Sequence, residues 1–329
     1  MTRQILQHHP KIGYTFVPNI RARVPHEGGG YLVRGNAQGF RCEHDFEAIK
    51  TGPRRRVLLF GDSFTAGDGV SNAERYGDRL EALVPDIEVY NFGLPGTGTD
   101  QHYLVYKEYA SKIDCDLVVI SVLVENIRRI AARYRPYGTQ DGKTVLYAKP
   151  YFTLDGNQLA LQNVPVGSAP LDEAALPEED LAYIDRGGRF ETVRKLVRRT
   201  GLKKIAQQAS RYQPVPEYND PAHPSWQIMK AILTAWLAEL KQPVVLVPLP
   251  LYQHVEGKSG ASGYQARFSE FCAGTGCILH DPLADLQRRS KAERRAMRFK
   301  RDIHPTPLGH AALAESLAPI VSNALHNLH

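Results

Sequence analysis

The stretch that decides the fold is Leu58–Phe64, which reads Leu-Leu-Phe-Gly-Asp-Ser-Phe. Apolar residues end there at a Gly-Asp-Ser turn, a pattern that predicts a buried strand whose carboxyl end presents Ser63. Open α/β sheets keep their reactive groups at that end of their strands. The tripeptide alone is common in loops, and Ser63 could simply cap the next helix. The interpretation therefore depends on the segments that follow.

Three later segments supply what a serine nucleophile lacks. They are Asn91-Phe92-Gly93, Glu125-Asn126 and Asp302-Ile303-His304. A serine hydroxyl is a poor nucleophile until a base removes its proton. One residue separates Asp302 from His304, so in extended backbone both side chains lean to the same side. Asp302 can then orient the His304 ring while that ring reaches Ser63.

Each member of this set also has a plainer explanation. Asp302 could cap the C-terminal helix, with His304 a solvated loop residue. Gly93 could serve only the turn Gly93–Gly96. His310 lies inside the predicted last helix, and we expect it to be structural. The order of the four segments favours the catalytic interpretation.

Together the four segments resemble the blocks of the SGNH (GDSL-type) hydrolase superfamily, which contribute Ser, Gly, Asn and His. The resemblance implies that Ser63, Asp302 and His304 are catalytic. It also implies an oxyanion hole made by the backbone amides of Ser63 and Gly93 and the side chain of Asn126. It implies no metal ion and no organic cofactor.

Two departures from the family pattern are visible. Relatives commonly place two residues between Asp and His, although the single-residue spacing occurs in members similar to alginate O-acetyltransferases. The third block reads Val124-Glu125-Asn126-Ile127 where the family usually shows Gly-x-Asn-Asp. The flanking residues Arg128 and Glu125 are candidate substrate contacts. A solvated basic face is the plainer explanation for Arg128 and its neighbours.

Apolar runs alternate with helical patterns along the chain, which predicts a mainly parallel sheet covered by helices. The resemblance refines this to a flavodoxin-like three-layer α/β sandwich. The predicted strands are Val57–Phe60, Ile87–Asn91, Leu117–Val122, Val244–Val247 and Cys277–His280. The predicted helices are Ala73–Leu83, Asp100–Lys112, Ser225–Lys241, Tyr264–Phe271 and Pro307–Leu325.

Two regions fall outside this core of residues 54–132 and 224–329. Residues 1–53 predict a β-rich N-terminal arm. Residues 133–223 separate the third and fourth strands by more than a crossover needs, which predicts a cap or lid above Ser63. An amphipathic stripe within it, Phe190–Val197, could pack as a lid helix or touch lipid.

The amino-acid composition limits the classes of protein to which this chain can belong. The 329 residues are 43% hydrophobic and 23% charged, typical of a globular protein, and the net charge of +6 fits an anionic substrate without requiring one. We expect a cytoplasmic protein with no transmembrane segment, since the N-terminus lacks the apolar core of a secretory signal. Cys272 and Cys277 are close enough in the sequence to pair if a turn forms between them, although free thiols are expected in a reducing compartment. No nucleic-acid-binding module is apparent, and the oligomeric state is left open.

The sequence thus predicts a serine esterase that removes an acyl group, most simply acetyl, from a carbohydrate-like or other small molecule. The acetyl and sugar parts come from the resemblance alone. An O-acyltransferase would pass the same acyl group to an acceptor hydroxyl. A lipase or thioesterase, and a non-catalytic binding module, are further alternatives.

Overall fold

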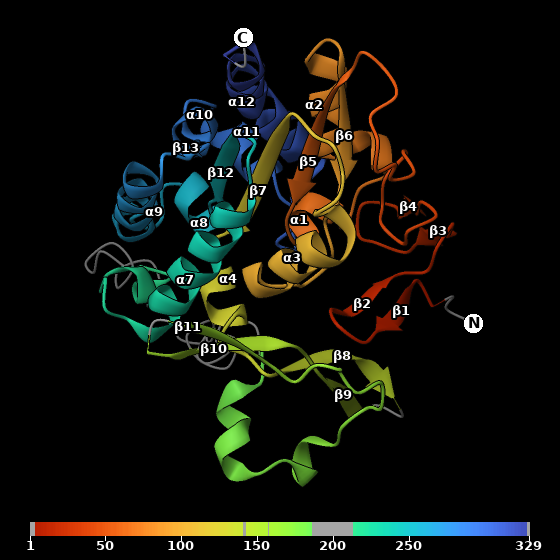
Figure 1. Ribbon diagram of the computed structural model, residues 1–329, viewed down its shortest axis with the longest axis vertical. Coiled ribbons are helices and arrows are strands. Elements are labelled where there is room, and N and C mark those ends of the chain that lie inside the picture. The colour runs from red at the N-terminus through yellow and green to blue at the C-terminus, as the bar shows by residue number, and fades with distance from the viewer. Residues whose placement is uncertain (1–3, 141–142, 157, 186–212, 328–329) are drawn as a thin grey trace.

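The centre of the molecule is a five-stranded parallel sheet in the order β13-β12-β7-β5-β6. The computed structural model describes residues 4–140, 143–156, 158–185 and 213–327. This sheet and the helices on both of its faces confirm the predicted α/β sandwich (Figure 1). The strands are β5 (Arg55–Phe60), β6 (Ile87–Asn91), β7 (Leu117–Leu123), β12 (Val244–Leu249) and β13 (Ile278–Leu279).

The sheet forms from these residues because their side chains are apolar on both faces. Every residue of β7 and β12 is buried, as expected for parallel strands with helices on each side. All five predicted strands form, and their ends differ from the predicted ones by at most two residues. Phe60 stacks on Phe92 and meets Trp236 edge-on, so the core continues directly beneath the Gly-Asp-Ser turn.

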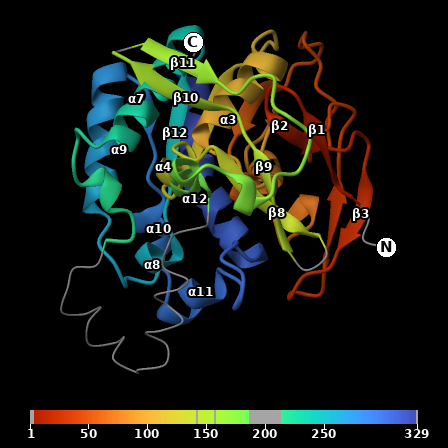
Figure 2. The same ribbon diagram turned by 90° about the horizontal axis from the view of Figure 1, so that it is seen from below.

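Helices form a layer on each face of the sheet (Figures 1 and 2). In one layer α2 (Tyr76–Leu83) packs against α12 (Pro307–His326); in the other, α7 (Pro224–Glu239) packs against α3 (Thr99–Val105) and α9 (Ser262–Thr275). The predicted helix Ala73–Leu83 is split, because extended Arg75 separates a 3₁₀ turn, Asn72–Glu74, from α2. The short helices are α1 (Ser63–Ala66), α4 (Asn126–Arg129), α8 (Tyr252–Val255), α10 (Leu283–Gln287) and α11 (Lys291–Ala296).

The strand order explains where a site can form. The chain passes from β5 to β6 on one side and then crosses to β7 on the other side of β5. Loops that leave β5 and β7 therefore diverge and open a crevice at the carboxyl ends of these strands. The predicted residues Ser63 and Asn126 begin the helices that follow β5 and β7.

The N-terminal arm contains two antiparallel hairpins. They are β1 (Leu6–His9) with β2 (Gly13–Phe16), and β3 (Arg21–Val24) with β4 (Tyr31–Arg34). The fully buried guanidinium of Arg41 donates to the backbone carbonyls of Gly67 and Val70. The arm is thereby attached to the loop that follows α1.

The insertion after α4 contributes two further hairpins beyond the carboxyl ends of the central strands (Figure 1). They are β8 (Tyr134–Gln140) with β9 (Lys143–Ala148), and β10 (Tyr151–Asp155) with β11 (Gln158–Gln162). The buried ammonium of Lys149 binds the Asp100 carboxylate and the carbonyls of Arg129 and Ala132, which fixes this insertion to the core. The amphipathic stripe Phe190–Val197 lies outside the described residues. None of the described helices has the length and apolar character needed to cross a bilayer.

Candidate active site

The turn after β5 presents Ser63 at the start of α1. A Cβ atom on Gly61 would lie 2.0 Å from the Thr65 hydroxyl oxygen, so only glycine fits this tight strand-to-helix connection. Asp62 caps the helix, because its Oδ1 accepts the Phe64 amide at 3.0 Å. Ser63 follows the cap, and its backbone N–H is among those that a helix leaves without an internal partner.

Ser63, His304 and Asp302 form a continuous chain of hydrogen bonds. His304 Nε2 lies 2.8 Å from Ser63 Oγ, and His304 Nδ1 lies 2.5 Å from Asp302 Oδ1. A carboxylate can only accept, so Nδ1 carries the ring proton and Nε2 is left to accept the serine hydroxyl. The Asp302 carboxylate also accepts the His304 backbone N–H at 3.1 Å. The single intervening residue thus allows Asp302 to orient His304.

The surrounding carboxyl groups raise the pKa of His304. Burial by itself lowers this pKa, but the hydrogen bond that His304 donates to Asp302 and the charges of Asp68, Asp302 and Asp62 outweigh burial. Burial acts in the opposite direction on Asp302, yet its hydrogen bonds to His304 and His26 hold its pKa below the ordinary value. Asp302 is therefore ionised when His304 is ready to take up a proton.

Arg129 joins the segment Glu125–Asn126 to the turn that carries Ser63. Its guanidinium donates to Asp62 Oδ2 at 2.7 Å, and the Asp62 side chain is fully buried. Arg128, one residue earlier, instead pairs with Glu217 and donates to the Pro214 carbonyl. The charge of Arg128 is thus already balanced within the protein. Glu125 is half-buried and precedes α4.

Asn126 is the first residue of α4 and is completely buried. Neither its side-chain oxygen nor its nitrogen has a hydrogen-bond partner among the described residues. A buried amide left in this state costs free energy, so proteins retain such groups mainly where they have a role. The position at the carboxyl end of β7, next to β5, suits a donor toward a group bound at Ser63.

Gly93 lies against the nucleophile helix, as its proposed role requires. A Cβ atom on Gly93 would come within 2.4 Å of the Ala66 nitrogen. Its own N–H, however, donates to Asn91 Oδ1 at 2.9 Å, while Asn91 Nδ2 donates to the Thr65 carbonyl at 3.0 Å. The Gly93 amide would have to share this bond in order to contact an oxyanion.

A comparison with known protein families agrees with the fold, with the four sequence segments and with the arrangement of Ser63, His304 and Asp302. Residues 59–312 match the model of the GDSL-like Lipase/Acylhydrolase family. The chain belongs to this family. Among curated proteins no sequence matches it.

Several solved structures are similar to this GDSL-family chain at low sequence identity. A lipolytic G-D-S-L protein from Veillonella parvula is 12% identical, with 81% of this chain and 97% of that chain covered and a TM-score of 0.42. TesA is 13% identical, with coverage of 82% and 99% and a TM-score of 0.44. An acetyl-xylooligosaccharide esterase from Geobacillus is 14% identical, with coverage of 82% and 95% and a TM-score of 0.44.

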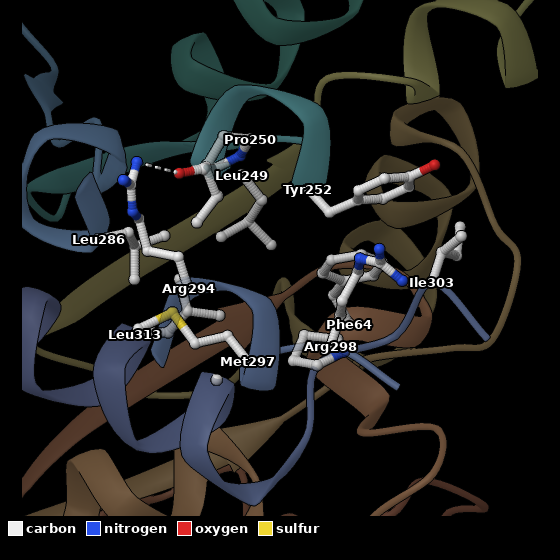
Figure 3. A pocket seen from close by; sticks show the side chains of 13 residues that line it. Phe64, Leu249, Pro250, Tyr252, Leu286, Arg294, Met297, Arg298, Ile303 and Leu313 are labelled. Atoms are coloured by element: carbon white, nitrogen blue, oxygen red, sulfur yellow. Dashed lines mark hydrogen bonds between the residues drawn. The ribbon is translucent and has the colours of Figure 1, made fainter. Parts of the chain in front are cut away.

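A pocket of this GDSL-family protein is lined in part by residues next to Ser63 and His304 in the chain, among them Phe64 and Ile303 (Figure 3). Phe64 adjoins Ser63, and Ile303 and Pro305 flank His304, so three pocket residues are chain neighbours of the hydrogen-bonded set. The pocket is small, with a volume of about 50 Å³, and it opens to solvent. Its remaining lining is mostly apolar and comes from α8, α10, α11, α12 and the end of β12: Leu249, Pro250, Tyr252, Val255, Leu286, Arg294, Met297, Arg298, Gly309 and Leu313.

Other features of the site were not evident from the sequence. His26 and Glu27 of the N-terminal arm both contact Asp302. They belong to no recognisable motif and lie far from Asp302 along the chain, so sequence patterns offer no signal for them. His310 accepts the Tyr76 N–H inside the core, and Cys272 and Cys277 are free thiols. In the described part of the chain, no group of three or more His, Cys, Asp or Glu residues is arranged to hold a metal ion.

Proposed function

We propose that this GDSL-family protein is a serine esterase in which Ser63 is the nucleophile, His304 the general base and Asp302 the group that orients His304. The observation that carries the proposal is the unbroken hydrogen-bonded chain from Ser63 Oγ through His304 to Asp302. Such a chain activates a hydroxyl that is otherwise a weak nucleophile.

The reaction proceeds in two acyl-transfer steps. Ser63 Oγ attacks the ester carbonyl while its proton moves to His304 Nε2. The tetrahedral intermediate collapses, the proton passes from His304 to the departing alkoxide, and an acyl-Ser63 ester and an alcohol result. Water, deprotonated by His304, then attacks this ester and releases the carboxylic acid and Ser63.

The negative oxygen of each tetrahedral intermediate needs hydrogen-bond donors. We assign this role to the backbone N–H of Ser63, the Asn126 side chain and the Gly93 N–H. The unpartnered, buried amide of Asn126 supports its assignment most directly. For Gly93 the existing bond to Asn91 must lengthen or bifurcate.

The proposal also concerns which acyl group the enzyme removes. An acetyl ester on a carbohydrate-like or other small molecule is the simplest substrate, and Glu125 and Arg128 remain proposed contacts for its leaving group. The apolar pocket beside Phe64 favours a second candidate, an ester with a longer acyl chain, as in lipases and thioesterases.

A fluorophosphonate probe tests the nucleophile directly. We expect stoichiometric labelling of the wild-type protein at Ser63, and neither labelling nor ester hydrolysis by Ser63→Ala, with the fold unchanged. Labelling of another residue, or undiminished hydrolysis by Ser63→Ala, would contradict the proposal. Hydrolysis of p-nitrophenyl esters from acetate to octanoate then separates the two acyl candidates. Burial of each added methylene should raise kcat/KM about fourfold if the pocket takes the chain.

Transfer to an acceptor hydroxyl is tested on the same enzyme. The hairpins β8–β9 and β10–β11 lie beyond the carboxyl ends of the strands (Figure 1), where a cap that limits water would favour acyl transfer. Products formed from an activated acetyl ester in the presence of sugars are separated by mass. Acetylated sugar identifies a transferase, whereas acetate alone identifies an esterase.

A further inference from the structure

The N-terminal arm reaches the carboxylate that orients His304. The turn between β3 and β4 carries His26 and Glu27, and these line a shallow hollow with Arg301, Asp302 and Ile303. His26 Nε2 lies 3.1 Å from Asp302 Oδ2, the oxygen that His304 does not use. The chain of hydrogen bonds that begins at Ser63 therefore extends one residue further, into a part of the sequence with no catalytic motif.

The backbone of the turn decides which nitrogen of His26 carries the proton. The Gly28 N–H donates to His26 Nδ1 at 3.3 Å. A nitrogen that accepts a hydrogen bond is unprotonated, so the neutral ring holds its proton on Nε2. His26 consequently donates to Asp302.

Close packing fixes the position of the His26 ring. Phe299 meets it edge-on with 4.4 Å between ring centroids, and the His26 side chain is only 13% exposed. Gly69 lies on the same rings, because a Cβ atom there would be 2.7 Å from Phe299 Cε2 and 3.1 Å from His26 Cε1. This glycine follows α1 closely along the chain, so the nucleophile loop itself helps to hold His26.

Glu27 anchors the backbone next to the same carboxylate. Its Oε1 accepts the N–H of Arg301 at 2.9 Å and that of Asp302 at 2.7 Å. Glu27 and Asp302 are acidic groups that act on His26, and Arg301 lines the same hollow. Asp302, Asp68 and Asp62 are the carboxyl groups that act on His304.

We propose that His26 is a positioning residue of the active site, which donates from Nε2 to Asp302 Oδ2 and so directs Asp302 Oδ1 toward His304. The inference rests on the proposed roles of Ser63, His304 and Asp302. By fixing both carboxylate oxygens, His26 holds the His304 ring in the tautomer and orientation that accept the serine proton. The arm is then a functional part of the site.

Three single variants separate hydrogen bonding from packing. His26→Phe keeps a ring but removes the donor, and kcat should fall about 10- to 100-fold with KM little changed, the usual effect of losing such a partner. His26→Gln can place an amide nitrogen near the Nε2 position, and it should recover most of the rate. The matched control is His44→Phe, because His44 also belongs to the arm but pairs with Glu81 of α2 and not with Asp302. It should leave kcat unchanged.

A double-variant cycle tests whether His26 acts through Asp302. In an Asp302→Ala background, His26→Phe should cause no further loss in the rate of fluorophosphonate labelling, since residues acting as a unit are not additive. An equal loss in both backgrounds, or a comparable loss of kcat in His44→Phe, would overturn the proposal in favour of a general effect on folding.

One measurement does not depend on activity. Histidine ¹⁵N chemical shifts should show a proton on His26 Nε2. A ring with its proton on Nδ1 and none on Nε2 would overturn the proposal even in an active enzyme. The protein could also show the expected ¹⁵N pattern but neither react with the probe nor cleave esters. In that case the proposed esterase function would be wrong, while the hydrogen bond from His26 to Asp302 would stand.

Discussion

Replacing Asn126 by alanine should separate catalysis from stability more sharply than any other change in this protein. Its amide is completely buried, and neither polar atom has a partner among the described residues. An unsatisfied buried polar group costs about 1–3 kcal/mol in the folded state. Alanine removes that cost but leaves a small void, which costs a comparable amount. We therefore expect the free energy of unfolding to change by no more than about 1 kcal/mol.

Asn126→Ala should also weaken the stabilisation of the transition state, and no second effect compensates for that loss. If the Asn126 amide donates to the oxyanion, its loss should lower kcat about 10²- to 10³-fold, or roughly 3–4 kcal/mol. KM should change little, because the neutral carbonyl of the substrate needs the donor less than the oxyanion does.

The assay combines urea unfolding with steady-state hydrolysis of the best p-nitrophenyl ester. Asn91→Ala is the matched control for stability, because Asn91 is similarly buried but both of its amide atoms are hydrogen-bonded. Its removal leaves the Gly93 N–H and the Thr65 carbonyl without these partners, so it should destabilise the fold by about 2 kcal/mol or more. An Asn126→Ala protein that loses this much stability while keeping kcat within about tenfold of wild type would show that Asn126 is structural.

The other predictions concern charge. The pKa of His304 is raised above 6.5, so kcat/KM should increase with pH with a midpoint above that value, because only the neutral ring accepts the serine proton. The raised pKa of His304 also stabilises the fold at pH values below the pKa of the unfolded state, and this stabilisation is lost as pH rises through the pKa of the folded state. Stability should therefore fall over the pH range in which activity rises. A rate that is flat from about pH 5 to 8 would contradict the assignment of His304. Arg129→Met should destabilise the fold by about 3–5 kcal/mol, since Asp62 would remain buried without its partner. Added Asp62→Asn, which keeps a capping oxygen, should restore part of that loss in urea unfolding, and no restoration would mean that Arg129 acts elsewhere.

Much of the architecture was predictable because its signals are local. The apolar runs that became β5, β6, β7, β12 and β13 are continuous, and strands buried on both faces require such runs. Less local features were harder to foresee. The predicted helix 73–83 is interrupted at Arg75, whose guanidinium is buried and bound to Asp78 and to the Arg41 carbonyl. That burial depends on the N-terminal arm, and no helical periodicity reports it.

The sequence by itself determined the family, the parallel sheet and the identity of Ser63, Asp302 and His304 as candidates, because four short blocks in a fixed order follow the ends of apolar strands. Only the tertiary structure decided which other groups meet them. Arg129, and not Arg128, contacts the nucleophile turn, and His26 reaches Asp302 across 276 positions of sequence. These contacts join side chains from separate loops, whose positions depend on the packing of the whole fold.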